Sequence, residues 1–148
     1  MTINVHSYES MGTFDGPGLR LVVFLQGCPF RCLYCANPDT MEAKGGTPTP
    51  PEEILQMAIS QKAFFGKKGG ITFSGGEPTL QAEVLIPLFK DLKANGIHIC
   101  LDTNGGIRNE KVEELLSLTD LVLLDLKEFN PEPVSYTHLR AHETKANL

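Results

Sequence analysis

Four short apolar runs constrain the fold of this chain more than any other feature. The runs are Leu19–Gln26, Gly70–Ser74, Ile97–Asp102 and Leu121–Lys127. Each is rich in Val, Ile, Leu or Phe and lacks the polar alternation of a half-exposed strand. That pattern is typical of strands buried on both faces of a parallel sheet. The runs therefore predict an α/β fold built on parallel strands.

Three segments between these runs have the spacing and the end signals of helices. The first opens at Pro50-Pro51, the second closes at Asn95-Gly96 and the third opens at Asn109-Glu110. We expect Pro87 near the first turn of the second helix, because an interior proline would break it. Strands that alternate with helices predict a repeated βα unit with right-handed crossovers.

Composition and charge narrow the classes of function. The chain has 148 residues and a net charge of −5 at pH 7, so we expect no broad attraction to nucleic acid or anionic lipid. No apolar run approaches the ~20 residues that a membrane-spanning helix needs. The first residues lack the basic start and apolar stretch of a secretory signal. We therefore expect a cytoplasmic protein with no nucleic-acid or membrane partner.

Three of the four cysteines, Cys28, Cys32 and Cys35, lie within eight residues. In a cytosolic chain, thiolates at such short spacing indicate iron–sulfur or zinc binding more than disulfides. The fourth, Cys100, lies inside an apolar run, where we expect a buried core thiol. Three ligands on a cubane cluster that normally takes four would leave one iron with an open position. A structural iron–sulfur or zinc-binding module remains the alternative.

Polar motifs follow the ends of all four predicted strands. The cysteine motif follows the first strand, and Gly75-Gly76-Glu77-Pro78 follows the second. Asp102-Thr103-Asn104-Gly105 follows the third, and Asp125-Leu126-Lys127 ends the fourth. Because βα barrels build their active sites at the carboxyl ends of the strands, we expect these motifs to converge on one rim.

These motifs together resemble the radical S-adenosylmethionine superfamily. Its marks are Cys-x3-Cys-x2-Cys with Tyr34 before the last cysteine, followed by Gly-Gly-Glu-Pro. The upstream Asp15-Gly16-Pro17-Gly18-Leu19-Arg20 looks like the glycyl-radical-activating branch. In combination with Tyr34–Thr40 and Leu101–Gly105, these motifs are similar to activating enzymes that act on pyruvate formate-lyase, and the resemblance covers about residues 5–131. Residues 36–74 contain no cysteine, which favours this type or the anaerobic ribonucleotide reductase type over relatives with extra clusters.

The resemblance implies a fold, cofactors and partners. The fold is a partial (βα) barrel, truncated after about four parallel strands. The cofactors are a [4Fe–4S] cluster on the three clustered cysteines, S-adenosyl-L-methionine and a monovalent cation. The implied reaction is reductive cleavage of S-adenosylmethionine to a 5′-deoxyadenosyl radical, which installs a glycyl radical on a partner enzyme. Pyruvate formate-lyase is the expected partner, and flavodoxin or ferredoxin the expected electron donor.

The resemblance also implies residue roles, and it requires no catalytic side chain beyond the cluster ligands. The residues implied to bind the S-adenosylmethionine cofactor are Tyr34, Ala36, Gly75, Gly76, Glu77, Asp125, Leu126 and Lys127. Those implied to bind the cation are Asp102, Thr103 and Asp125, and those implied to touch the partner are Asp15, Gly16, Gly18 and Arg20. Ala36 stands where some relatives carry His, so any contact of that His is absent.

The end of the chain departs from the pattern. We expect residues 1–133 to form the core and residues 134–148 to be irregular, either a non-native tail or a surface tail. Val134–Leu148 has no apolar face at either period, so we expect no strand there. The family's partial barrel has six strands. We therefore expect an incomplete enzyme, with an exposed edge after the fourth strand and little activity of its own.

Overall fold

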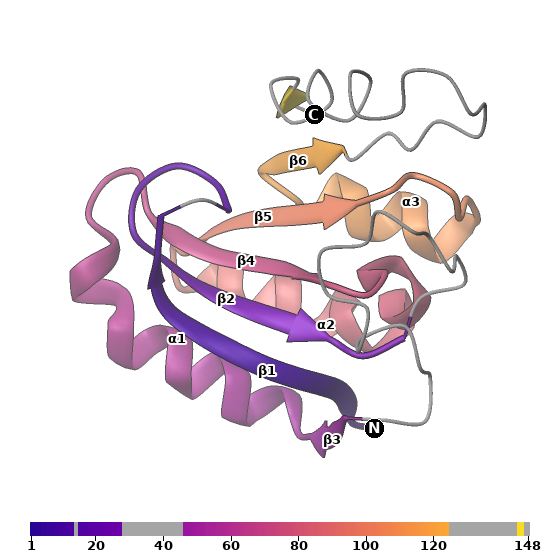
Figure 1. The fold of residues 1–148 in the computed structure, drawn as a ribbon, viewed down its shortest axis with the longest axis horizontal. Coiled ribbons are helices and arrows are strands. Elements are labelled where there is room, and N and C mark those ends of the chain that lie inside the picture. The colour runs from indigo at the N-terminus through magenta and orange to yellow at the C-terminus, as the bar shows by residue number, and fades with distance from the viewer. Residues whose placement is uncertain (14, 28–45, 125–144, 147–148) are drawn as a thin grey trace, which may run out of the picture.

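The structure, a computed structural model, describes residues 1–13, 15–27, 46–124 and 145–146. Strands and helices alternate through most of this part of the chain (Figure 1). In chain order the elements are β1 (Ile3–Gly12), β2 (Arg20–Leu25), β3 (Thr47–Thr49), α1 (Pro51–Phe65), β4 (Gly70–Gly75), the 3₁₀ turn η2 (Pro78–Gln81), α2 (Ala82–Ala94), β5 (His98–Thr103), α3 (Glu110–Ser117), β6 (Leu121–Leu124) and β7 (Lys145–Ala146).

One open sheet holds all of these strands, in the order β3-β1-β2-β4-β5-β6-β7. The four central strands, β2, β4, β5 and β6, are parallel, and each coincides with one of the four apolar runs. The predicted parallel α/β core is therefore confirmed. The sheet does not close on itself, which fits a partial barrel.

Three strands of the sheet were not predicted from the sequence. β1 and β3 extend the sheet beyond β2, and both pair antiparallel. β7 lies in the segment expected to offer no strand, and it pairs antiparallel with β6. The edge of β6 is thus partly covered, which corrects the expectation of an uncovered edge. Backbone hydrogen bonds alone can form so short a strand, and a two-residue strand has no side-chain period to detect.

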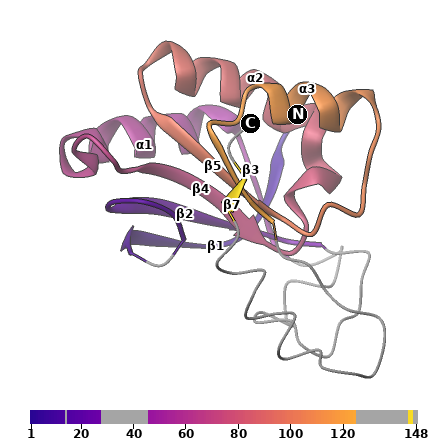
Figure 2. The same ribbon diagram turned by 90° about the horizontal axis from the view of Figure 1, so that it is seen from above.

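Helices α1, α2 and α3 cover one face of the sheet, as Figure 2 shows. α1 begins at Pro51 with two glutamates in its first turn, and α3 begins after Asn109, whose side chain accepts a hydrogen bond from the Val112 N–H. The prediction for Pro87 was wrong, because it lies inside α2. Its ring is exposed, while buried neighbours such as Leu85 hold that turn against the sheet despite the missing N–H.

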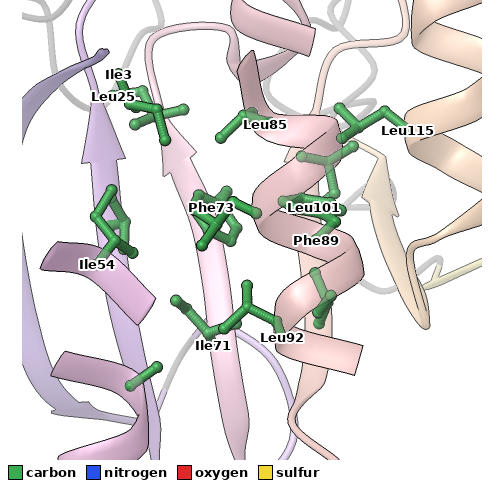
Figure 3. Close-up of a cluster of buried hydrophobic side chains, with 14 of the residues drawn as sticks. Ile3, Leu25, Ile54, Ile71, Phe73, Leu85, Phe89, Leu92, Leu101 and Leu115 are labelled. Carbon is green, nitrogen blue, oxygen red and sulfur yellow. The ribbon is translucent and has the colours of Figure 1, made fainter. Parts of the chain in front are cut away.

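The hydrophobic core fills the space between these helices and the sheet. Phe73 of β4 and Phe89 of α2 lie at its centre, with ring centroids 4.9 Å apart (Figure 3). Alternate strand residues such as Leu21, Ile71 and Leu101 face this core. The residues between them therefore face the opposite side of the sheet. On the central strands that side carries Arg20, Thr72, Ser74, Cys100 and Asp102.

Candidate active site

The segment Gly75–Glu77 leaves the end of β4 and folds onto the end of β2. Gly75 has a φ of 96°, and a Cβ there would lie 2.5 Å from the Leu25 nitrogen, so only glycine fits. The Gly76 N–H donates to the Leu25 carbonyl at 2.9 Å, and the Glu77 N–H donates to the Gly27 carbonyl at 2.7 Å. Gly27 directly precedes Cys28 in the sequence. The backbone of the motif is therefore fixed beside the start of the cysteine segment.

The Glu77 carboxylate is buried, with 1% of the residue exposed, and it accepts four hydrogen bonds. Its Oε2 accepts from the Thr79 N–H at 3.1 Å, the Thr79 hydroxyl at 2.5 Å and the Thr103 hydroxyl at 2.6 Å. Its Oε1 accepts from the Asn104 N–H at 2.9 Å. These donors compensate a charge that would otherwise be costly to bury. Glu77 thereby links the ends of β4 and β5.

Asp102 lies on the opposite face of β5 from Thr103, because successive strand residues alternate. The Ser74 hydroxyl donates to Asp102 Oδ2 at 2.9 Å, so a second side-chain bond joins the ends of β4 and β5. Ser74 is buried and Asp102 is half-buried. The two strand ends are thus cross-linked on both faces of the sheet.

The predicted cation ligands Asp102 and Thr103 do not point the same way. The Thr103 hydroxyl donates to Glu77 and accepts the Gly105 N–H at 3.1 Å, on the helix-covered face. The third predicted ligand, Asp125, lies outside the described residues. Within the described ranges, no three His, Cys, Asp or Glu side chains gather as a metal site.

Several other predicted site residues also lie outside the described part of the chain. They are Cys28, Cys32, Tyr34, Cys35, Ala36, Leu126 and Lys127. In the sequence the cysteines follow the end of β2, and the last two residues follow the end of β6. Their roles remain predictions.

Cys100 is buried in β5, as expected for a thiol inside an apolar strand. Its Sγ lies 3.9 Å from His98 Nδ1, near the beginning of the strand. The Gly75–Glu77 segment follows the other end of the neighbouring strand β4. This placement keeps Cys100 away from the edge where the candidate site lies.

Arg20 corrects an expectation, because its side chain is fully buried at the amino end of β2. Its guanidinium donates to the Thr72 hydroxyl and, among other carbonyls, to those of Pro17 and Ile71. It also bonds His98 Nδ1 at 3.0 Å. Burial lowers the pKa of this guanidinium from its usual value. With its donors used inside the protein, Arg20 holds the fold together and offers no group to a partner.

The other residues of the upstream motif surround Arg20. The Asp15 carbonyl accepts from the Thr72 hydroxyl at 2.6 Å. A Cβ on Gly16 would lie 2.9 Å from Cys100 Sγ, and one on Gly18 would lie 2.5 Å from the Gly69 nitrogen. Both glycines have a positive φ, so close packing and backbone conformation each require glycine there. This motif thus closes the amino edge of the sheet.

Sequence reasoning missed Ser74 and Thr79 as supports of the site. A signal for Thr79 exists, because a carboxylate two residues before a threonine, with proline between, can cap a helical turn. Glu77 does cap η2 in this way, accepting the Thr79 N–H. Nothing in the sequence indicates the contact of Ser74, which depends on the register between β4 and β5.

The chain is similar to proteins of one known family. A family model described as the radical SAM superfamily, where SAM is S-adenosylmethionine, matches residues 22–148. The chain is 48% identical over 131 residues to pyruvate formate-lyase 1-activating enzyme of Escherichia coli K12, covering 86% of this chain and 53% of that protein. It is 51% identical over 136 residues to the pyruvate formate-lyase-activating enzyme of Streptococcus mutans, covering 86% of this chain and 52% of that protein.

The Listeria monocytogenes pyruvate formate-lyase-activating enzyme is 45% identical over 150 residues, covering 97% of this chain and 58% of that protein. The chain thus spans between half and three-fifths of the length of these relatives. In the described part of the chain, no helix has the length and apolar character to cross a membrane. The matching family implies a [4Fe–4S] cluster and S-adenosylmethionine as cofactors. With the family model matching most of its length, this chain belongs to the radical S-adenosylmethionine superfamily.

Proposed function

We propose that this chain forms the cofactor-binding part of an activating enzyme for pyruvate formate-lyase. That enzyme cleaves S-adenosylmethionine reductively and installs a glycyl radical on its partner. The observation that carries the proposal is the fixed Gly75–Glu77 segment, whose Glu77 N–H bonds the carbonyl directly before Cys28. The relatives at 45–51% identity all bear the name of a pyruvate formate-lyase-activating enzyme.

Cys28, Cys32 and Cys35 would hold three irons of the [4Fe–4S] cluster. Three thiolates at this spacing suit such a cluster and leave its fourth iron open to another ligand. A bound and reduced cluster would supply the one electron that cleaves a carbon–sulfur bond of S-adenosylmethionine to give methionine and a 5′-deoxyadenosyl radical. The chain's own residues would bind and orient the cluster and S-adenosylmethionine, and the reaction requires no side-chain acid or base.

The Gly75–Glu77 segment fits the amino group of the methionine moiety. The N–H groups of Gly76 and Glu77 are used by the Leu25 and Gly27 carbonyls, so the groups that this segment would offer to a ligand are its own carbonyl oxygens. An ammonium group carries only donors and matches such a surface. Gly75 and Gly76 are half-buried, and their lack of side chains permits close approach.

The remaining contacts are proposed from the sequence motifs. Tyr34, Ala36, Leu126 and Lys127 would complete the cofactor site, and Asp125 would serve both the cofactor and the cation. The half-buried Asp102 carboxylate, oriented by Ser74, supports a cation beside the cofactor carboxylate. Carboxylate oxygens suit such a hard cation.

We place the partner contact on Asp15, Gly16 and Gly18, because Arg20 is committed to the fold. Flavodoxin or ferredoxin would deliver the electron, and the cytoplasm is the proposed location. Anaerobic ribonucleotide reductase is the competing partner, but no observation on this chain favours it over pyruvate formate-lyase.

Anaerobic reconstitution with iron and sulfide tests the cluster assignment. The chain should gain about four irons and a broad visible absorption. Cys28→Ala, Cys32→Ala and Cys35→Ala should each abolish both, whereas the matched control Cys100→Ala should keep them. A chain that binds only zinc, or a Cys100→Ala variant without iron, would contradict the assignment.

Electron paramagnetic resonance tests the partner. The loaded chain is incubated with S-adenosylmethionine, a reductant and either purified pyruvate formate-lyase or anaerobic ribonucleotide reductase. Because the chain spans little more than half the length of its relatives, we expect only a weak glycyl radical signal, and we expect it only on pyruvate formate-lyase. A signal only on the reductase would replace the proposed partner by the alternative.

A further inference from the structure

We propose that Thr103 is a positioning residue whose hydroxyl holds Glu77, and through Glu77 the Gly75–Gly76 backbone, in place for the cofactor. This role differs from the cation ligation that the motif implies for Thr103. The inference rests on the proposed function for its consequence, but its structural part stands on contacts within the described residues.

The four hydrogen bonds on the Glu77 carboxylate are of two kinds. Both bonds from Thr79 are local, because Thr79 lies two residues along the chain in the same turn. The bonds from Thr103 and Asn104 come from the end of β5. Of these two, the Asn104 bond uses a backbone N–H. Among the described residues, the Thr103 hydroxyl is therefore the side-chain donor that ties Glu77 to the neighbouring strand.

The hydroxyl of Thr103 is already engaged on both sides. Its proton goes to Glu77 Oε2 at 2.6 Å, and its oxygen accepts the Gly105 N–H at 3.1 Å. The residue is 4% exposed and faces away from Asp102. A cation near Asp102 would have to displace these bonds to reach this oxygen. The Thr103 hydroxyl therefore serves as a hydrogen-bond donor to the Glu77 carboxylate.

Glu77 passes this constraint to the glycine segment. Its own N–H and that of Gly76 are bonded to the end of β2, while its side chain is bonded to the end of β5. The glycine segment is therefore held between two strand ends. Loss of the Thr103 bond would leave the Asn104 N–H bond to Oε1 in place but weaken this side of the arrangement, so that the backbone beside the cofactor could shift.

A pair of substitutions separates the hydroxyl of Thr103 from its volume. Thr103→Val keeps the shape and loses the hydroxyl, whereas Thr103→Ser keeps the hydroxyl and loses the methyl group. Thr119→Val is the matched control, because Thr119 is 5% exposed and donates its hydroxyl to the Leu115 carbonyl away from the site. Hydrogen exchange of the cofactor-free chain is the first measurement.

We expect Thr103→Val to speed exchange at the Thr79 and Asn104 amides, which donate to Glu77. Thr103→Ser and Thr119→Val should leave both amides protected. The reverse pattern, with Ser exposing these amides and Val protecting them, would show a packing role and overturn the inference. Equal protection in all three variants would overturn it as well.

The second measurement is the affinity for S-adenosylmethionine, read from the change it causes in the electron paramagnetic resonance spectrum of the reduced cluster. Thr103→Val should weaken this affinity about tenfold, the effect of losing one hydrogen bond to a charged group. The affinity should respond to added monovalent cations as it does in the wild type. A Thr103→Val variant that loses only the cation dependence would restore Thr103 as a cation ligand and overturn the inference.

The two measurements distinguish a failure of the proposed function from a failure of the inference about Thr103. A wild-type chain that shows no spectral change with S-adenosylmethionine would count against the proposed function. The exchange pattern of the same chain would still decide whether Thr103 holds Glu77.

Discussion

The amino ends and the carboxyl ends of the parallel strands, here called the amino edge and the carboxyl edge, each bury one charged side chain. The hydrogen bonds that compensate the charge differ between the two. At the amino edge the guanidinium of Arg20 donates to backbone carbonyls, a threonine hydroxyl and His98. At the carboxyl edge the carboxylate of Glu77 accepts from two hydroxyls and two backbone N–H groups. Both residues are almost fully inaccessible to solvent.

The edges differ in what they leave available to a ligand. Around Arg20, the glycines of the upstream motif pack against Cys100 and Gly69 and close the edge. Around Glu77, the neighbouring Gly75, Gly76 and Asp102 stay half-buried. This division matches βα barrels, in which the carboxyl edge carries the chemistry and the opposite edge serves stability. Substitutions at the two edges should therefore separate stability from cofactor binding.

The largest expected loss of stability is for Arg20→Met. The variant leaves buried carbonyls, such as that of Ile71, without their donor and should lower the free energy of unfolding by about 3 kcal/mol. Denaturant unfolding measures this loss. The control is Arg108→Met, because Arg108 is exposed and pairs only at the surface with Glu113, so its loss should stay within about 1 kcal/mol. Equal losses in both variants would refute the structural role of Arg20.

Glu77→Gln should lower the free energy of unfolding less than Arg20→Met does, but it should weaken cofactor binding more. Its amide NH₂ would face hydrogen-bond donors such as the Asn104 N–H, which should lower the free energy of unfolding by about 2 kcal/mol. The folded variant should also bind S-adenosylmethionine more weakly, whereas folded Arg20→Met should bind it normally. If Arg20→Met rather than Glu77→Gln loses affinity for S-adenosylmethionine, the proposed division between the two edges is wrong.

Ser74→Ala should have a smaller effect. It removes one hydrogen bond to Asp102 from the end of β4 and should lower the free energy of unfolding by about 1 kcal/mol. The core should be unaffected, because Ser74 lies on the face of the sheet away from the helices. Ser74→Thr, which keeps the hydroxyl, is the control for the hydrogen bond. A loss in Ser74→Ala that Ser74→Thr shares in full would point to packing instead.

The smallest effect is a pH dependence at the amino edge. Burial and the neighbouring Arg20 lower the pKa of His98, with Lys93 acting in the same direction and Asp120 against it. As the pH falls through about 6.5, the unfolded chain takes up a proton that the folded chain resists, so stability falls. Above that range His98 does not contribute to the pH dependence of the free energy of unfolding.

Urea unfolding between about pH 8 and about pH 5.5 tests this effect in the wild type and in His98→Asn. The asparagine carbonyl can accept a hydrogen bond from Arg20 but does not titrate. The variant should therefore lose less stability than the wild type as the pH falls. Identical slopes in the two proteins would show that His98 does not contribute.

The sequence predicted the parallel strands because burial on both faces leaves a continuous apolar run, as in Val22 and Val23 of β2. β1 was missed because it pairs antiparallel near the edge of the sheet and buries few of its residues, among them Ile3 and Val5. Its outer half is exposed and has no apolar pattern. Short strands such as β7 arise from backbone pairing alone.

The candidate site was predicted in outline by the motifs at the strand ends, but its internal contacts were not. Arginine is mostly an exposed residue, so the full burial of Arg20 at the start of its apolar run was not expected. The direction of the Thr103 hydroxyl depends on the register of β5 against β4. That register is set by packing over the whole sheet, and no local pattern encodes it.

The most direct test of the carboxyl edge as a cofactor site is the formation of 5′-deoxyadenosine. The iron-loaded chain is reduced with dithionite, mixed with S-adenosylmethionine and analysed by liquid chromatography with mass detection. We predict product from the wild type and from Cys100→Ala, and none from Cys28→Ala, Cys32→Ala or Cys35→Ala. An iron-loaded, reduced wild-type chain that forms no 5′-deoxyadenosine, or product that persists without these cysteines, would contradict the proposed function.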